Sequence, residues 1–135
     1  MMKPKKTLSE QQSAMQKRLA RNQQQSYLRK REQRLIYARA HNLEVKAEVL
    51  THYGWDGTLR CCWDGCSVND VDMLTLDHTA DDGAQKRASG EGNGQGLYKK
   101  LRKLNFPAGY QTLCANHQLK KEVERRRSKA ASAHA

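Results

Sequence analysis

Residues 61–66 read CCWDGC and residues 113–117 read LCANH, and these two stretches decide the fold. They hold all four cysteines of the chain in two clusters, with His117 beside the second cluster. In a reducing compartment, clustered cysteines are more often metal ligands than disulfide partners. Zinc prefers four thiolate or imidazole ligands in tetrahedral geometry, commonly supplied as two closely spaced pairs. The two stretches therefore predict a structural zinc site.

The predicted zinc ligands are Cys62, Cys66, Cys114 and His117. Cys114 and His117 lie three residues apart at the start of an expected helix, so both side chains share one face. The first pair is ambiguous because Cys61 and Cys62 are adjacent, and Cys61 is the alternative to Cys62. If Cys61 and Cys62 both bound zinc, His117 would not be a zinc ligand and could have another role. The alternative to any zinc site is a set of small buried cysteines without a metal.

The chain of 135 residues is short of apolar material, with 37% hydrophobic residues and a mean hydropathy of -0.96. This length predicts one domain with a small core, to which zinc would add about 10 kcal/mol of apparent folding free energy. No stretch approaches the roughly 18 apolar residues of a membrane span, and the first residues lack the apolar run of a secretory signal. We therefore expect a cytoplasmic protein without a membrane partner.

Positive charge is concentrated at the two ends of the chain, whose net charge is +11. Residues 1–42 hold 11 lysines and arginines against two acids, and residues 119–135 hold six against two. Residues 43–118 hold eight basic and ten acidic residues. Basic arms around a slightly acidic centre suit a protein whose arms hold a polyanion while its centre holds cations. The alternative is two solvated basic tails.

The expected elements are mostly helical. Thr7 to Glu10 has the capping-box pattern, and no glycine or proline interrupts the stretch to about Ala40, which predicts one long or broken helix. A further helix is expected from Leu43 to Tyr53, before Gly54. We also expect strands at 73–76 and 110–113, a loop at 88–96, a helix at 97–104 and a final helix from 115 onward. The predicted fold class is α+β.

Asp77 and His78 directly follow the strand expected at 73–76, close to the predicted zinc-bound loops. Neutral imidazole can take a proton from water, and a carboxylate can hold a divalent cation that stabilises charge on a phosphate. The pair is therefore suited to phosphodiester hydrolysis. Taken alone, an Asp-His dipeptide is more often an incidental loop pair.

The segments LTLDH (74–78), DGAQKR (82–87) and NFPAGYQTLCANH (105–117), together with Cys66, resemble the HNH endonuclease family. The match covers about residues 44–121 and looks most like the small phage and mobile-element members. It implies a zinc-stabilised ββα-metal domain preceded by a basic helical arm. The implied parts are an arm at 1–42, folded or disordered without DNA, an HNH-like domain at 43–121 and a basic C-terminal tail at 122–135.

The resemblance also implies roles for individual residues. His78 falls on the general base, Asp77 on a ligand of the catalytic cation, and Arg87 on a basic position that can contact phosphate. Gln118 falls where the family has His or Asn as the other cation ligand, and Gly109 falls on the middle Asn. A glutamine oxygen can ligate magnesium, but its side chain is longer and less rigid.

These features predict a DNA endonuclease with a His general base and catalytic Mg²⁺ or Mn²⁺, in which zinc only holds the fold. The alternative is a catalytically inactive, zinc-bound DNA-binding module of the same fold, which Gly109 and Gln118 favour. Double-stranded DNA would be held by the basic arms, without any organic cofactor. We expect a DNA-associated protein of the cytoplasm, or of a host cytoplasm for a phage protein, and leave monomer and dimer open.

Overall fold

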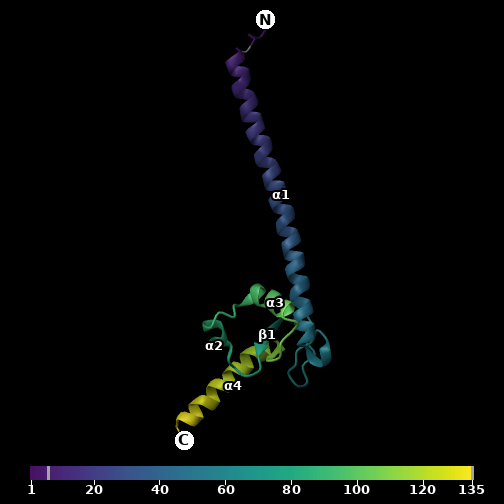
Figure 1. The fold of residues 1–135 in the computed structure, drawn as a ribbon, viewed down its shortest axis with the longest axis vertical. Coiled ribbons are helices and arrows are strands. Elements are labelled where there is room, and N and C mark those ends of the chain that lie inside the picture. Colours follow the sequence, from purple (N-terminus) through teal and green to yellow (C-terminus); the bar gives the residue numbers. More distant parts are fainter. Residues whose placement is uncertain (6, 135) are drawn as a thin grey trace. The chain divides into compact units, whose positions relative to one another are not determined.

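The computed structural model describes residues 1–5 and 7–134, so Lys6 of the predicted arm and Ala135 of the predicted tail lie outside the described residues. The chain divides into two compact units, Met1–Ala40 and His41–Ala135. This division lies inside the first helix. Figure 1 colours the chain from its N-terminus in purple to its C-terminus in yellow.

The helix α1 runs from Leu8 to His52 (Figure 1). The predicted capping box begins it: the Thr7 N–H donates to the Glu10 carboxylate (2.7 Å), and the Glu10 N–H donates to the Thr7 hydroxyl (3.3 Å). The further helix expected from Leu43 is the last part of α1. No glycine or proline lies within the helix, so nothing in the sequence interrupts its backbone hydrogen bonds.

The part of α1 in the first unit keeps its large apolar side chains in solvent. Met15, Leu19, Leu28, Leu35 and Ile36 are 45% to 64% exposed. Their spacing does not form a continuous helical stripe. Among the residues described in this unit none is buried, so the unit contributes no apolar core.

The second unit is built on a two-stranded antiparallel sheet. β1 (Leu74–His78) pairs with β2 (Tyr110–Cys114), with Leu74 opposite Cys114 and His78 opposite Tyr110. Both predicted strands are confirmed, each slightly longer at its C-terminal end. Asp77 therefore lies within β1 rather than after it. The predicted α+β class is confirmed.

Among the described residues of this unit, four short or medium helices accompany the sheet. They are a 3-10 turn at Trp55–Gly57, α2 (Gly83–Ala88), α3 (Gly94–Lys103) and α4 (Ala115–Ala133). The helices expected at 97–104 and from 115 onward correspond to α3 and α4, whereas α2 was not predicted. The residues predicted as a C-terminal tail continue α4 as far as Ala133.

Two small apolar clusters form the core of the second unit. One contains Leu50, Leu74 and Leu113 together with three of the cysteines. The members of the other are Val45, Val49, Tyr53, Leu97 and Leu101. Within this second cluster, the two valines lie four residues apart on α1 and the two leucines four apart on α3, so each helix presents one face.

Buried hydrogen bonds attach the end of α1 to β2. The buried Thr112 donates its N–H to the Tyr53 carbonyl (3.0 Å) and its hydroxyl to the Leu50 carbonyl (2.8 Å). These bonds satisfy carbonyl groups at the C-terminal end of α1, where helical partners are missing. The Thr112 carbonyl accepts from the Cys62 N–H (2.8 Å). The end of α1, the cysteine-rich loop and the sheet are therefore joined at one residue.

Candidate metal centre and adjoining cavity

Four side chains from separate parts of the second unit meet at one point. Cys61 and Cys66 come from the loop before β1, Cys114 from the end of β2 and His117 from the first turn of α4. Their sulfur and imidazole nitrogen atoms all lie within 4.8 Å of one another. The separations include 3.2 Å from Cys114 Sγ to His117 Nδ1 and 3.9 Å from Cys66 Sγ to Cys114 Sγ.

These separations are close to those of a tetrahedral metal site, with 3.2 Å just below and 3.9 Å just above the ideal range. With Zn–S bonds of about 2.3 Å and Zn–N bonds of about 2.0 Å, the ligand atoms of a tetrahedral zinc site lie roughly 3.5–3.8 Å apart. Cys61 Sγ lies 3.7 Å from His117 Nδ1, within that range. Three thiols and one imidazole form a donor set that closed structural zinc sites use. The group could therefore hold a metal ion such as zinc.

Cys62, the ligand preferred from the sequence, lies outside this group, and the alternative, Cys61, takes its place. The Cys62 thiol donates to the Tyr53 carbonyl instead (3.2 Å). Adjacent residues in extended backbone point to opposite sides. Two backbone hydrogen bonds determine which thiol faces the other ligands. The Cys61 N–H donates to the Val68 carbonyl, and the Cys62 N–H donates to the Thr112 carbonyl.

The thiols of the centre differ in their proton affinity. Burial raises the pKa of Cys61 to about 11, although the N–H groups of Cys114 (3.2 Å) and Trp63 (3.5 Å) point at its sulfur. The Val68 N–H lowers the pKa of Cys66. A bound cation would favour the thiolate at both positions, since a coordinating thiol is deprotonated.

The His117 ring is held by the first turn of α4 and by an aromatic neighbour. Cys114 caps the helix, so His117 lies three residues into it and turns toward the thiols. The Trp63 indole stacks on the imidazole, with centroids 4.8 Å apart and planes inclined by 9°. Lys120 Nζ lies 5.7 Å from the Trp63 ring centroid. The imidazole therefore has a fixed orientation toward the sulfur atoms.

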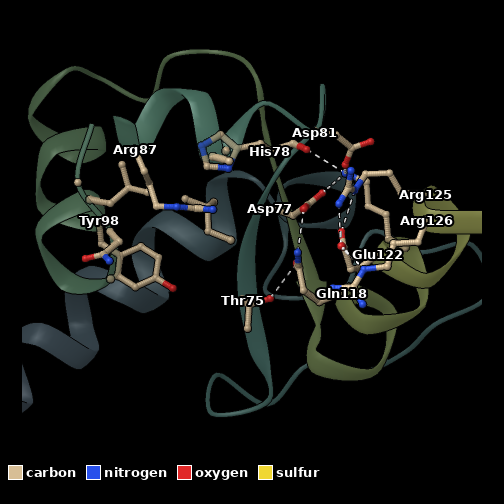
Figure 2. Close-up of a pocket in the computed structure, with 18 residues that line it drawn as sticks. Thr75, Asp77, His78, Asp81, Arg87, Tyr98, Gln118, Glu122, Arg125 and Arg126 are labelled. Atoms are coloured by element: carbon tan, nitrogen blue, oxygen red, sulfur yellow. Dashed lines mark hydrogen bonds and ion pairs between the residues drawn. The ribbon is translucent and has the colours of Figure 1, made fainter. Parts of the chain in front are cut away.

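A cavity of about 550 Å³ lies among β1, α2, α3 and α4 (Figure 2). All four residues predicted for catalysis and cation binding line it, namely Asp77, His78, Arg87 and Gln118. The other lining residues are Thr75, Leu76, Asp81, Gly83, Ala84, Gly92, Asn93, Gly94, Leu97, Tyr98, Lys121, Glu122, Arg125 and Arg126. The fold thus brings together residues that are far apart in the sequence.

Asp77 is buried beside this cavity and has three hydrogen-bond donors. Gln111 Nε2 (2.8 Å) and Lys121 Nζ (2.5 Å) donate to Oδ2, and Gln118 Nε2 donates to Oδ1 (3.0 Å). The Gln118 carbonyl oxygen accepts from the Thr75 hydroxyl (3.3 Å). Gln118 therefore turns its nitrogen toward Asp77, and a half-turn of the amide would present the oxygen.

Lys121 is a residue of this site that the sequence analysis missed. Its Nζ lies 2.9 Å from the Asp81 carboxylate and also donates to the His78 carbonyl (2.9 Å). Burial alone would lower the pKa of Lys121, but hydrogen bonds to Asp77 and Asp81 outweigh it and raise the pKa. The sequence could have indicated Lys121, because it lies three residues after Gln118 on the same helix and therefore shares its face.

His78 is buried at the end of β1, and its Nε2 lies 2.8 Å from Glu91 Oε2. The other oxygen of Glu91 accepts from the Tyr110 hydroxyl. Glu91 belongs to the glycine-rich segment 88–96, for which the sequence predicts a loop. No periodic pattern or motif marked it, so its role becomes visible only in the structure.

Positive charge lies around the carboxylates of the cavity (Figure 2). Arg87 comes from α2, and α4 contributes Arg125 and Arg126. Glu122 holds both α4 guanidinium groups, with the Nε of each at 2.8 Å from its carboxylate. These bonds to Arg125 and Arg126 hold the pKa of Glu122 at about 2. Arg125 gives both Nε and Nη2 to Glu122, so a phosphate would be contacted by the remaining N–H groups of the two arginines.

Gly109, aligned with the family's middle Asn, is not among the residues that line the cavity. Its φ of 110° belongs to a backbone region that favours glycine. Its carbonyl accepts from the Thr79 N–H (3.1 Å), directly after β1. The backbone conformation therefore accounts for a glycine at position 109.

Comparison with known proteins found no matching family model, no matching curated protein and no matching solved structure. Over the described residues, no helix is long and apolar enough to span a membrane.

Proposed function

We propose that this chain is a DNA endonuclease in which His78 is the general base, while Asp77 and Gln118 hold a divalent cation. The observation that supports this proposal most strongly is that these three residues and Arg87 line one cavity of about 550 Å³. A base, a carboxylate for a cation and cationic side chains for phosphate are the groups that phosphodiester hydrolysis uses. The sequence resemblance to HNH endonucleases supports the same function.

Asp77 fits the role of cation ligand. A buried carboxylate needs a positive partner, and the Lys121 ammonium at 2.5 Å is that partner in this structure, so a divalent cation would have to take the place of Lys121. Mg²⁺ and Mn²⁺ take carboxylate and amide oxygens as ligands, and Gln118 would supply its oxygen after a half-turn of the amide. A cation bound there would polarise the phosphate and stabilise the leaving oxygen.

The other residues of the cavity would act directly on water and phosphate. His78 would take the proton of the attacking water, which is worth about 10²–10⁴-fold in rate. The Arg87 guanidinium would bind oxygens of the phosphate under attack. Arg125 and Arg126, fixed by Glu122, would bind a neighbouring phosphate of the same strand.

The Cys61, Cys66, Cys114 and His117 group would hold zinc for the fold and not for the reaction. Four protein ligands leave zinc no open position for substrate. His117 directly precedes Gln118 on α4, and Cys114 ends β2. Zinc bound to both would therefore fix the first turn of α4 against the sheet that carries Asp77 and His78.

Double-stranded DNA is the substrate that the charge distribution favours. Residues 1–42 hold 11 lysines and arginines against two acids, and α3 adds exposed basic residues near the cavity. Such side chains bind phosphates by displacing condensed counterions, which gives affinity that falls steeply with salt. The arm would therefore supply binding, and the cavity would supply the reaction.

One observation favours a second candidate, a catalytically inactive DNA-binding module. Asp77 already has three donors, and Gln118 turns nitrogen rather than oxygen toward it. A carboxylate neutralised by Lys121 needs no divalent cation. In this alternative the carboxylate would only anchor α4 to β1, and DNA would be bound without cleavage.

Cleavage of supercoiled plasmid by zinc-loaded protein separates the two candidates. We expect cleavage with Mg²⁺ or Mn²⁺ and none when the divalent cation is omitted. Omission is preferable to EDTA, since a chelator would also remove zinc. Replacing His78 with Ala should slow cleavage by about 10²–10⁴-fold while leaving DNA affinity, measured by fluorescence anisotropy, unchanged.

The matched control is His134→Ala, because His134 is exposed at the end of α4 and does not line the cavity. It should cleave at the wild-type rate. Plasmid that stays intact with every cation, while DNA binding is preserved, would reject the nuclease in favour of the binding module. Equal rates for the wild type and His78→Ala would reject His78 as the base.

A further inference from the structure

The Glu91 carboxylate connects two residues that face each other across the sheet. His78 is paired with Tyr110 in the antiparallel register, so their side chains lie on one face with ring centroids 5.0 Å apart. Glu91 Oε2 lies 2.8 Å from His78 Nε2, and its Oε1 accepts from the Tyr110 hydroxyl. The His78 and Glu91 side chains are only 11% and 10% exposed.

Backbone bonds hold Glu91 in this position. Its N–H donates to the Lys86 carbonyl (3.0 Å), and the Gly90 N–H donates to the Arg87 carbonyl (3.1 Å). Both acceptors belong to α2. The segment after this helix is therefore attached to it, and Glu91 approaches His78 from a fixed backbone.

The protonation states of Glu91 and Tyr110 show which of the groups in contact with Glu91 donates each hydrogen bond. Burial alone would raise the pKa of Glu91, but hydrogen bonds from Tyr110 and His78 outweigh it and lower the pKa. Burial and the Glu91 carboxylate raise the pKa of Tyr110. Glu91 is thus an ionised acceptor and Tyr110 a neutral donor. An ionised carboxylate only accepts hydrogen bonds, so His78 Nε2 must carry a proton.

The other imidazole nitrogen faces Gly83 at the cavity wall. A methyl group at Gly83 would lie 2.8 Å from His78 Nδ1 and 3.2 Å from Arg87 Nη1. Contacts of 2.8 Å are too short for carbon, so a side chain here would push the imidazole or the guanidinium away. Both Gly83 and His78 line the cavity. In neutral imidazole with Nε2 protonated, Nδ1 is the unprotonated atom.

We infer that Glu91 is a positioning residue, which fixes His78 as the Nε2–H tautomer and leaves Nδ1, above Gly83 and beside Arg87, as the atom that accepts a proton. The catalytic consequence rests on the proposed function, whereas the tautomer is a property of the folded chain alone. A carboxylate that orients a histidine and stabilises its protonated form recurs in unrelated enzymes.

The proposed reaction is hydrolysis of a phosphodiester bond. An O–H bond of water breaks and its proton goes to His78 Nδ1, while the water oxygen forms a bond to phosphorus. The P–O bond to the leaving sugar oxygen breaks, and that oxygen takes a proton from solvent. His78 then returns its proton to solvent. Glu91 stays ionised throughout and offsets the charge of the imidazolium.

The first test is the tautomer of His78 in the zinc-loaded, full-length wild type. Long-range ¹H–¹⁵N correlation of ¹⁵N-histidine-labelled protein, assigned by the loss of signals in His78→Ala, distinguishes the two nitrogens. We expect a protonated Nε2 and an unprotonated Nδ1, with that preference lost in Glu91→Ala. A wild-type ring protonated at Nδ1, or a Glu91→Ala ring unchanged from the wild type, would overturn the inference.

The second test separates positioning from simple structural support. Glu91→Ala should lower kcat for DNA cleavage by about 10–100-fold with little change in KM, and Glu91→Asp should recover part of the loss. Glu124→Ala is the matched control, since this exposed acid of α4 does not line the cavity. An equal fall in kcat for both variants would contradict a specific role for Glu91.

The third test uses Gly83→Ala, which should keep the Nε2–H tautomer and still lower kcat, because the added methyl group crowds Nδ1. Full activity in this variant would show that Nδ1 is not the accepting atom. Zinc content and far-UV circular dichroism establish that each variant is folded. An Nε2–H ring in a wild type that cleaves no DNA would support the positioning of His78 and overturn only the proposed nuclease function.

Discussion

Side-chain direction in the loop before β1 decides which cysteine can bind a metal. Cys61 has no exposed surface and meets the other three ligand atoms, whereas Cys62 donates to the Tyr53 carbonyl. Sequence spacing is almost the same for both residues. What separates them is the backbone bond from Cys61 to Val68, which turns one thiol inward.

Cys61→Ser should therefore lower zinc affinity by at least about 100-fold, since even residues that only support a metal ligand change affinity by 10–100-fold. Cys62→Ser should bind zinc like the wild type, because it loses only a thiol bond to a carbonyl. Competition with a chromophoric chelator measures both affinities. Strong binding by Cys61→Ser and weak binding by Cys62→Ser would restore the ligand first predicted from sequence.

At the same scale, sequence reasoning selected Asp77, His78, Arg87 and Gln118, which all line one cavity. The structure brings these four residues together, whereas their catalytic and cation-binding roles stay predictions. Lys121 was missed although its helical spacing from Gln118 was readable. Glu91 could not have been found, since its contact with His78 depends on how the glycine-rich segment folds back on α2.

The helix α1 has two different parts. Its residues from Val45 onward supply buried side chains, while its leucines before Ala40 stay largely exposed. The part from Val45 onward is buried because it packs against α3 in the second core cluster. The helix therefore contributes to the stability of the second unit mainly through its last turns.

Leu101→Ala should destabilise the second unit by about 2–5 kcal/mol, because Leu101 is 1% exposed in a small cluster and its truncation leaves a cavity. Leu28→Ala, at a residue that is 48% exposed, should change the free energy of unfolding by no more than about 0.5 kcal/mol. Urea unfolding of the zinc-loaded variants measures both. Similar destabilisation by the two changes would place a core contact at Leu28.

Elements with strong local signals could be predicted from the sequence. The Thr7–Glu10 capping box begins α1, and the apolar runs at β1 and β2 form the sheet. The continuity of α1 past Ala40 was not predicted, because the change in hydrophobic pattern suggested a new helix. α2 was missed because a six-residue helix carries too little periodicity to be recognised.

At the scale of the whole chain, the apolar core is small for 135 residues, and the candidate metal centre lies within one of its two clusters. Removing zinc should cost about 10 kcal/mol of apparent folding free energy, more than such a core can replace. We expect chelation to abolish the near-UV circular dichroism of the second unit, with recovery on adding zinc. Unchanged spectra after complete zinc removal would contradict a folding role for the metal.

We propose that the basic arms bind DNA and that the cavity of the second unit cleaves it. Single-turnover cleavage of an end-labelled duplex, with zinc-loaded full-length protein in excess and Mn²⁺ present, tests this claim most directly. We predict cleavage by the wild type and by the exposed control Asp72→Asn, and at least about 100-fold slower cleavage by Asp77→Asn with unchanged DNA affinity. No cleavage by the wild type, or equal rates for Asp77→Asn and the control, would contradict it.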